Sequence, residues 1–187
     1  MISRQEAIKL LHEKMQSSNL RKHCYSVEVA MRGLAKYFKE DEDKWGIVGL
    51  LHDGDYEFTK EDPGNHAKLM ASWVRELGET DNELLTGIES HGWFHQGKLP
   101  QTKMQWSLFC CDELTGLIIA VTLVRPEKKL SLVTVDNVLS KWNQKAFAAG
   151  VKREDIEKCD KELGIPLKEF VKIVLGAMQG ISSELGL

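Results

Sequence analysis

The chain has 187 residues, of which 42% are apolar and 28% are charged, as is typical of one globular domain with a sizeable core. Lys and Arg total 25 against 28 for Asp and Glu, a formal net charge of -3, which argues against bulk binding to nucleic acid. We expect a cytoplasmic protein with no membrane partner, because no apolar run approaches the roughly 18 residues of a spanning helix and the polar start is unlike a signal peptide. The four cysteines have no Cys-x-x-Cys spacing and are expected to be reduced and structural.

Apolar residues recur mostly at helical spacing, and strand-like alternation is nearly absent outside residues 130–133, so the sequence predicts an all-α fold. Ser3 and Glu6 have the spacing of a capping box for the first helix. The expected helices are, in chain order, about 3–15, 18–38, 41–54, 65–77, 81–91, 102–124, 134–140, 141–149, 153–163 and 166–185. We expect a single domain over residues 1–187, with helices 130–187 packed against a bundle formed by the earlier ones.

Histidines and aspartates interrupt the apolar faces of several expected helices. Residues of this kind on four helices are His23, His66, His91 and Asp112. A lone buried carboxylate costs several kcal/mol unless it is paired or binds a cation, and no Lys or Arg shares the helix face of Asp112. A fifth apolar helix ends in the doublet formed by residues 52 and 53. A single His-Asp doublet is weak evidence for a functional site. Together with the His and Asp residues on the apolar faces of the other four helices, it favours one shared site.

This pattern resembles that of the HD-domain metal-dependent phosphohydrolases. Those proteins combine a His on one helix, a His-Asp doublet that ends another, and a later Asp on a long helix. The matching positions here are His23, His52, Asp53 and Asp112. The resemblance is closest to small bacterial HD proteins with Leu-His-Asp-x-Asp-Tyr-Glu at the doublet, as residues 51–57 read here, and it covers about residues 20–125. It implies an HD-domain helical bundle.

Superfamily members that hold two metals have two further histidines between the doublet and the last Asp, and His66 and His91 occupy matching places. The resemblance implies one or two divalent transition metal ions, with Asp53 as the bridging ligand. A mixture of imidazole and carboxylate suits Mn, Fe, Co, Ni or Zn without selecting one of them. A metal-activated water would then hydrolyse a phosphate mono- or diester, and we expect a nucleotide-like small molecule as the substrate.

Further residues near these positions are candidates for catalysis or substrate binding. Asp55 and Glu57 follow the doublet and could handle protons beside Asp53, although an acid there is more often a loop cap. Phosphate could be held by basic side chains, although most lysines are simply solvated. The residues that we consider for substrate binding are Lys68, His95 and Arg125.

The sequence also allows other functions. Some HD-fold proteins with a similar ligand set carry two irons and perform oxygenase chemistry. A non-catalytic HD module that senses a nucleotide, or a polar core network without metal, is a further alternative. Trp106 and Trp142 could form part of a homo-oligomer interface or complete the core. The residues after 130 have no separate function that we can assign.

Overall fold

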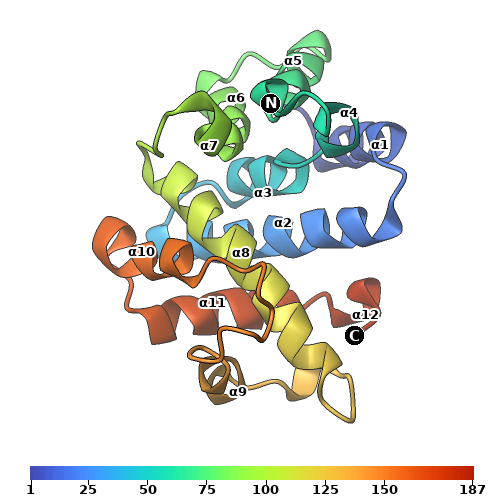
Figure 1. Cartoon of the computed structure of the whole chain (residues 1–187). Helices are drawn as coiled ribbons and strands as arrows, with labels where there is room; N and C mark the ends of the chain where they lie inside the picture. Colours follow the sequence, from blue (N-terminus) through green and yellow to red (C-terminus); the bar gives the residue numbers. More distant parts are fainter.

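The structure is a computed structural model that describes residues 1–187. It is all-α, which confirms the predicted fold class (Figure 1). The α-helices are α1 (Arg4–Lys14), α2 (Ser18–Phe38), α3 (Glu42–Leu51), α4 (Tyr56–Thr59), α5 (Lys68–Glu76), α6 (Asn82–Glu89), α7 (Trp93–Gln96), α8 (Lys103–Leu123), α9 (Val135–Ser140), α10 (Arg153–Leu163), α11 (Leu167–Gln179) and α12 (Ser182–Leu185). Three short 3-10 turns are η1 (Pro63–Asn65), η2 (Ser90–Gly92) and η3 (Leu130–Leu132).

Two long helices, α2 and α8, form the centre of the bundle. Helix α2 packs against α3, α8 and α11, and α8 also packs against α10 and α11. In Figure 1 the helices from α1 to α7 lie on one side of this crossing, except for α2 itself, and α9 to α12 lie on the other. The C-terminal helices therefore pack on the N-terminal bundle, as the sequence predicts.

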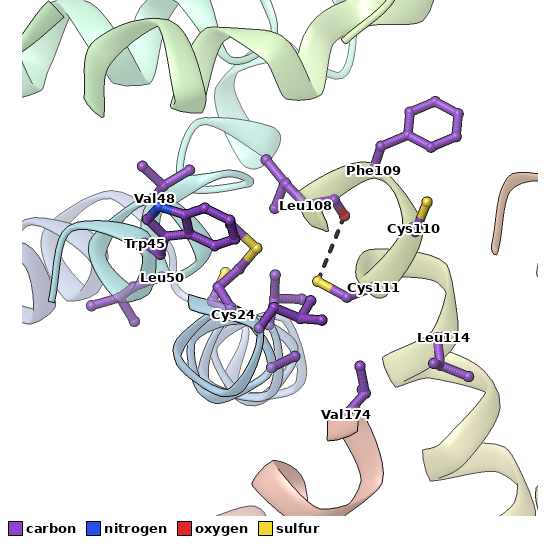
Figure 2. Close-up of a cluster of buried hydrophobic side chains, with 14 of the residues drawn as sticks. Cys24, Trp45, Val48, Leu50, Leu108, Phe109, Cys110, Cys111, Leu114 and Val174 are labelled. Atoms are coloured by element: carbon purple, nitrogen blue, oxygen red, sulfur yellow. Dashed lines mark hydrogen bonds between the residues drawn. The ribbon is translucent and has the colours of Figure 1, made fainter. Parts of the chain in front are cut away.

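One hydrophobic core joins the two sides of the molecule. It contains 44 buried residues, from Ile2 near one end of the chain to Leu185 near the other. Figure 2 shows part of it, where Cys24 of α2 lies beside side chains of α3 and α8, and Val174 of α11 closes the far side. All four cysteines are free and buried, in agreement with the structural role expected for them. The apolar stripes of α2 and α11 pack here against α3 and α8, which are apolar around most of their circumference, and this packing fixes how the four helices cross.

Helix boundaries follow the capping residues where local signals are strong. Ser3 and Glu6 form the predicted capping box. Ser17, Asp41, Asp81 and Thr102 each accept a hydrogen bond from a main-chain N–H in the first turn of their helices. Because these caps are local, the start of each of those helices could be predicted to within one or two residues.

Five predictions of local structure were wrong. Residues 141–149 form turns instead of a helix, because the guanidinium of Arg153 binds main-chain carbonyls of this segment that a helix would use internally. The expected helix 166–185 is divided at Gly180 into α11 and α12. The expected helix 65–77 begins only at Lys68, and the expected helix 81–91 ends at Glu89. Residues 130–132 form η3 and not a strand.

Helix α8 has an unusual composition for a helix of a globular bundle. By length and composition it could cross a membrane. This differs from the expectation that no apolar segment is long enough to do so. In the structure, 61% of its most apolar window is buried inside the protein. Its apolar character therefore corresponds to its central place in the core, where several helices cover it.

Candidate metal centre

Six polar side chains from separate parts of the chain meet at one place, next to the crossing of α2 and α8. They are His23 of α2, His52 and Asp53 at the end of α3, His66 after η1, His91 in η2, and Asp112 of α8. The side chain of His52 is fully buried, and those of the other five are 12–23% exposed. The cluster is thus packed on one side and reachable by solvent on the other.

His23, His52 and Asp112 form the first group of this cluster. The Nε2 atom of His23 lies 2.9 Å from Asp112 Oδ1 and 3.2 Å from His52 Nε2, and His52 Nε2 lies 3.5 Å from Asp112 Oδ1. Two ligand atoms about 2.1 Å from one ion are about 3.0 Å apart at a right angle and about 3.4 Å apart at the tetrahedral angle. The spacing of these three atoms therefore suits a shared metal ion.

The tautomer of His52 is set by its own helix. Its Nδ1 lies 2.7 Å from the main-chain oxygen of Gly49, and a carbonyl oxygen only accepts hydrogen bonds. Nδ1 therefore carries a proton, and Nε2, which faces His23 and Asp112, is the atom of this ring that could bind a metal. Metal-binding histidines commonly have this second hydrogen bond, which fixes the orientation of the ring.

Asp53 connects this first group to a second one. Its Oδ2 lies 3.8 Å from Nε2 of both His23 and His52. Its Oδ1 lies 3.2 Å from Nε2 of His66 and 3.1 Å from Nε2 of His91. The two oxygens of one carboxylate thus face two different sets of histidines, which is the arrangement required of a ligand that bridges two ions.

Behind the second group, Asp55 holds His66 in place. Asp55 is fully buried, and its Oδ1 accepts a hydrogen bond of 2.8 Å from Nδ1 of His66. Its other oxygen accepts a hydrogen bond from the main-chain N–H of Met70, at 2.9 Å. The first bond places the ring proton of His66 on Nδ1 and leaves Nε2 free to face Asp53. Asp55 therefore positions a ligand.

Close contacts of the backbone bring the ligands together. A Cβ atom on Gly49 would lie 2.7 Å from the main-chain oxygen of Val27, so this glycine allows α3 to approach α2 closely. A Cβ atom on Gly92 would lie 2.7 Å from the main-chain oxygen of His66, so η2 can approach His66 closely. Ala67 has a φ of 67°, a left-handed conformation that costs about 1–2 kcal/mol for a residue other than glycine. The chain adopts it directly after His66, where it turns into α5.

The electrostatic balance of the cluster favours a cation. Burial alone would raise the pKa of Asp53 and of Asp112, but the surrounding histidines hold both values well below the usual range. Burial alone would lower the pKa of His66, but its hydrogen bonds to Asp53 and Asp55 raise it to about 9. The pKa of His91 is raised as well, since the carboxylate of Asp53 outweighs burial.

These shifts mean that, without a metal, protons on His66 and His91 offset the charge of the carboxylates that they face. Only histidines lie within 4.0 Å of the Asp53 and Asp112 oxygens as basic partners. An ionised carboxylate in such a place requires a positive charge next to it. The residues present therefore fit a divalent cation, which would take the place of these protons. Two groups have ligand atoms close enough to hold an ion: His23, His52 and Asp112, and His52, Asp53 and His91.

The structure does not bring the other candidate residues of the sequence into this cluster. Glu57 accepts hydrogen bonds from the main-chain N–H groups of Gln16 and Ser17, which lower its pKa, and it thereby fixes the start of α2. Lys68 donates to the carbonyl of Gly64.

Two further candidates lie on other parts of the surface. Arg125 bonds to Asn137 and follows Asp112 by 13 residues, a separation of about 20 Å along a helix. His95 lies in α7 with its ring against Phe94. The predicted metal ligands therefore meet, whereas Glu57, Lys68 and Arg125 form hydrogen bonds to residues outside the cluster.

Sequence reasoning missed the positioning role of Asp55, which it treated as a catalytic group. Next to Asp55, the ring centroid of Tyr56 lies 6.2 Å from that of His66 at the exposed side of the cluster. The spacing of Asp55, two residues after the doublet, was the only signal for its role. Comparison of the chain with known protein families, with curated proteins and with solved structures finds no match. The function has to be inferred from the chemistry of the site.

Proposed function

We propose that this protein is a metal-dependent hydrolase of phosphate mono- or diesters, of the HD-domain kind that its sequence resembles. The observation that supports this most strongly is the position of Asp53, whose two oxygens face two separate sets of histidines. A structural hydrogen-bond network has no need of six ionisable groups from five segments, because each buried group of this kind is costly without a counter-charge.

In this proposal each residue of the cluster has a place in a two-ion site. His23, His52, Asp53 and Asp112 would hold one ion, and Asp53, His66 and His91 would hold the second. Divalent ions at such a site lower the pKa of a bound water toward neutrality and offset the charge of the phosphoryl oxygens. The protein supplies the geometry, because His52 is fixed by the Gly49 carbonyl and His66 is fixed by Asp55.

The exposure of the cluster supports a small substrate. Five of the six side chains are 12–23% exposed, so a phosphate group can reach them while the core side stays closed by His52. Tyr56 lies beside His66 and is 42% exposed, which offers an aromatic surface at the entrance. A phosphoester with an aromatic or apolar organic part, such as a nucleotide, would suit this entrance.

The test is hydrolysis by the metal-loaded protein. We would incubate it with Mn²⁺, and separately with Zn²⁺ and Fe²⁺, and offer p-nitrophenyl phosphate, bis-p-nitrophenyl phosphate and nucleoside monophosphates. Metal-dependent phosphate release that is lost in Asp53→Ala is expected. Asp136→Ala is the matched control, because Asp136 is 84% exposed and lies on α9. Asp136→Ala should retain wild-type turnover.

Three results would contradict the proposal. Consumption of oxygen by a protein that contains two irons, without phosphate release, would favour the oxygenase alternative. Tight binding of a nucleotide without turnover under any metal would favour a sensing module. Wild-type turnover in Asp53→Ala would show that the observed hydrolysis occurs elsewhere or comes from a contaminant.

A further inference from the structure

A surface pocket lies in the C-terminal part of the chain, outside the metal centre. It has a volume of about 420 Å³ and is bounded by the segment between α9 and α10 and by the first turns of α10. The indole of Trp142 and three cationic side chains, those of Lys145, Lys152 and Arg153, line it. Two acids also line it, and one of them, Glu157, accepts a hydrogen bond of 2.7 Å from the indole N–H of Trp142.

The three cationic groups of this pocket have no carboxylate partner within 4.0 Å. The guanidinium of Arg153 donates to main-chain carbonyls of the segment, the shortest bond being 2.6 Å to Phe147, so it is hydrogen-bonded but not neutralised. The side chains of Lys145 and Lys152 are exposed. Three cationic and two acidic side chains give this hollow a net lining charge of +1 in a chain of net charge -3, and because the cations are not paired with the acids they favour an anionic ligand.

The pocket is next to the elements that carry two of the metal ligands. The main-chain N–H of Lys152 donates to Glu113, at 3.2 Å, and Glu113 follows Asp112 directly. The ammonium of Lys152 lies 5.4 Å from the ring centroid of Phe94, three residues after His91. In Figure 1 the segment that leads into α10 passes beside the middle of α8. Lys152 therefore lines the pocket and also contacts the helix that carries Asp112 and the segment that follows His91.

We propose that this pocket binds a second phosphate group of the substrate, one that is not hydrolysed at the metal centre. The inference rests on the proposed function and narrows it to phosphoesters that carry two separated anionic groups. Lys145 and Lys152 would bind the second phosphate, and Trp142 would contact the organic part between the two groups. The C-terminal region, which has no counterpart in the resemblance noted above, would then set specificity.

Matched substrates can separate the two sites. We would use alkane-1,n-diol bisphosphates of two to eight carbons and the alkyl monophosphates of equal length, and measure phosphate release and, by isothermal titration calorimetry, binding. The wild type should prefer the bisphosphate of a suitable length at least tenfold, through a lower KM. The Lys145→Ala/Lys152→Ala variant should raise KM for that bisphosphate at least tenfold and leave its kcat and the monophosphate kinetics unchanged.

The control is Lys168→Ala/Lys172→Ala on α11, which removes the same two charges from exposed side chains outside the pocket. Equal effects of the two double variants would overturn the proposal, because the lysines would then act only through net charge. Absence of any preference for a bisphosphate would also overturn it. If free inorganic phosphate binds in a lysine-dependent way and no bisphosphate is preferred, the proposal is overturned and the pocket is a site for free phosphate.

Failure of the proposed function gives a different result. In that case no compound is hydrolysed, yet calorimetry still shows bisphosphate binding that weakens at least tenfold in Lys145→Ala/Lys152→Ala and not in the control. If hydrolysis occurs but kinetics and binding are the same in both double variants, the metal centre is active and the pocket is not part of its substrate site.

Discussion

The two halves of the metal centre are built in different ways. His23 and Asp112 lie within the two longest helices, and His52 is fixed by a hydrogen bond to the Gly49 carbonyl one turn earlier. His66 and His91 lie on short irregular segments, one after η1 and one in η2. The first group is held by the core of the bundle, whereas the second depends on Asp55 and on a close approach of two loops.

This difference indicates that the two ions would be bound unequally. Ligands on packed helices are pre-positioned, because moving them would disturb the core. Ligands on loops can move more easily, and the buried acid behind His66 has to keep that ring in place. We therefore expect the first group to bind its ion more tightly than the second, and the following predictions break or sharpen this comparison.

The largest effect is expected for Asp53→Ala, because each of the two oxygens of Asp53 faces a different set of histidines. The variant should lose the ion of the second group, bind the first ion more weakly, and lose hydrolysis by a factor on the order of 1000. Far-ultraviolet circular dichroism should show a helix content near that of the wild type. Normal metal content in this variant would contradict the bridging position of Asp53.

His52→Ala and His91→Ala should differ in which of the two metal ions they lose. We expect His52→Ala to remove the ion of the first group and to weaken the binding of the second, because His52 belongs to both sets of three residues whose ligand atoms are close enough to hold an ion. His91→Ala should remove only the second ion. Metal counts per chain after dialysis measure this difference. Equal losses in the two variants would show that the ions bind as an inseparable pair.

Asp55→Asn changes the group that orients His66 and keeps its size. The amide has one acceptor oxygen in place of two, so it can accept from the Nδ1–H of His66 or from the Met70 N–H but not from both. Either His66 loses its acceptor, or the side chain that orients it loses its own hydrogen bond to the main chain. The affinity of the second ion should fall roughly 10- to 100-fold, and that of the first should stay near the wild-type value. Competition with a fluorescent chelator would measure both. An equal fall in both affinities would point to a general loss of stability.

The affinity of the second ion should depend on pH. Its ligand His66 has a pKa raised to about 9 in the metal-free protein, by hydrogen bonds to Asp53 and Asp55 that outweigh burial. At pH 7 the metal must displace this proton, so binding should release protons and strengthen as the pH rises toward 9. Calorimetry at pH 7 in two buffers of different ionisation enthalpy would reveal the release. Identical heats in both buffers would contradict it.

The smallest effect is expected for Glu57→Ala, which tests a residue outside both groups. Glu57 accepts two main-chain hydrogen bonds at the start of α2, so its loss should lower the free energy of unfolding by about 1 kcal/mol, as for other caps. Metal content should not change. Chemical denaturation and elemental analysis would measure the two quantities. A fall in metal content without a fall in stability would assign Glu57 to the site after all.

The difference between ligands on long helices and ligands on short segments also explains which site residues could be predicted from the sequence. His23 and Asp112 were found by their places on apolar helix faces, a local and periodic signal. His66 was found for an incorrect structural reason, because it lies before α5 and not within it. The left-handed Ala67 that separates it from the helix has no sequence signal, since alanine normally favours helix.

Roles that depend on tertiary contacts could not be predicted. Glu57 follows the doublet closely, yet it bonds to a segment 40 residues earlier in the chain. Arg153 prevents the helix expected at residues 141–149 through bonds that only the folded chain brings together. Helical periodicity identifies the face of a helix, but it does not identify which loop crosses that face.

The metal content of the purified protein tests the central claim most directly. We would measure it by mass spectrometry on untagged protein prepared without chelator, in the wild type, His52→Ala and His91→Ala. The proposed site predicts up to two equivalents of a divalent transition metal in the wild type, a loss of the tighter ion in His52→Ala, and one remaining equivalent in His91→Ala. A wild-type protein that contains no metal, and takes up none from Mn²⁺, Fe²⁺ or Zn²⁺, would contradict the account.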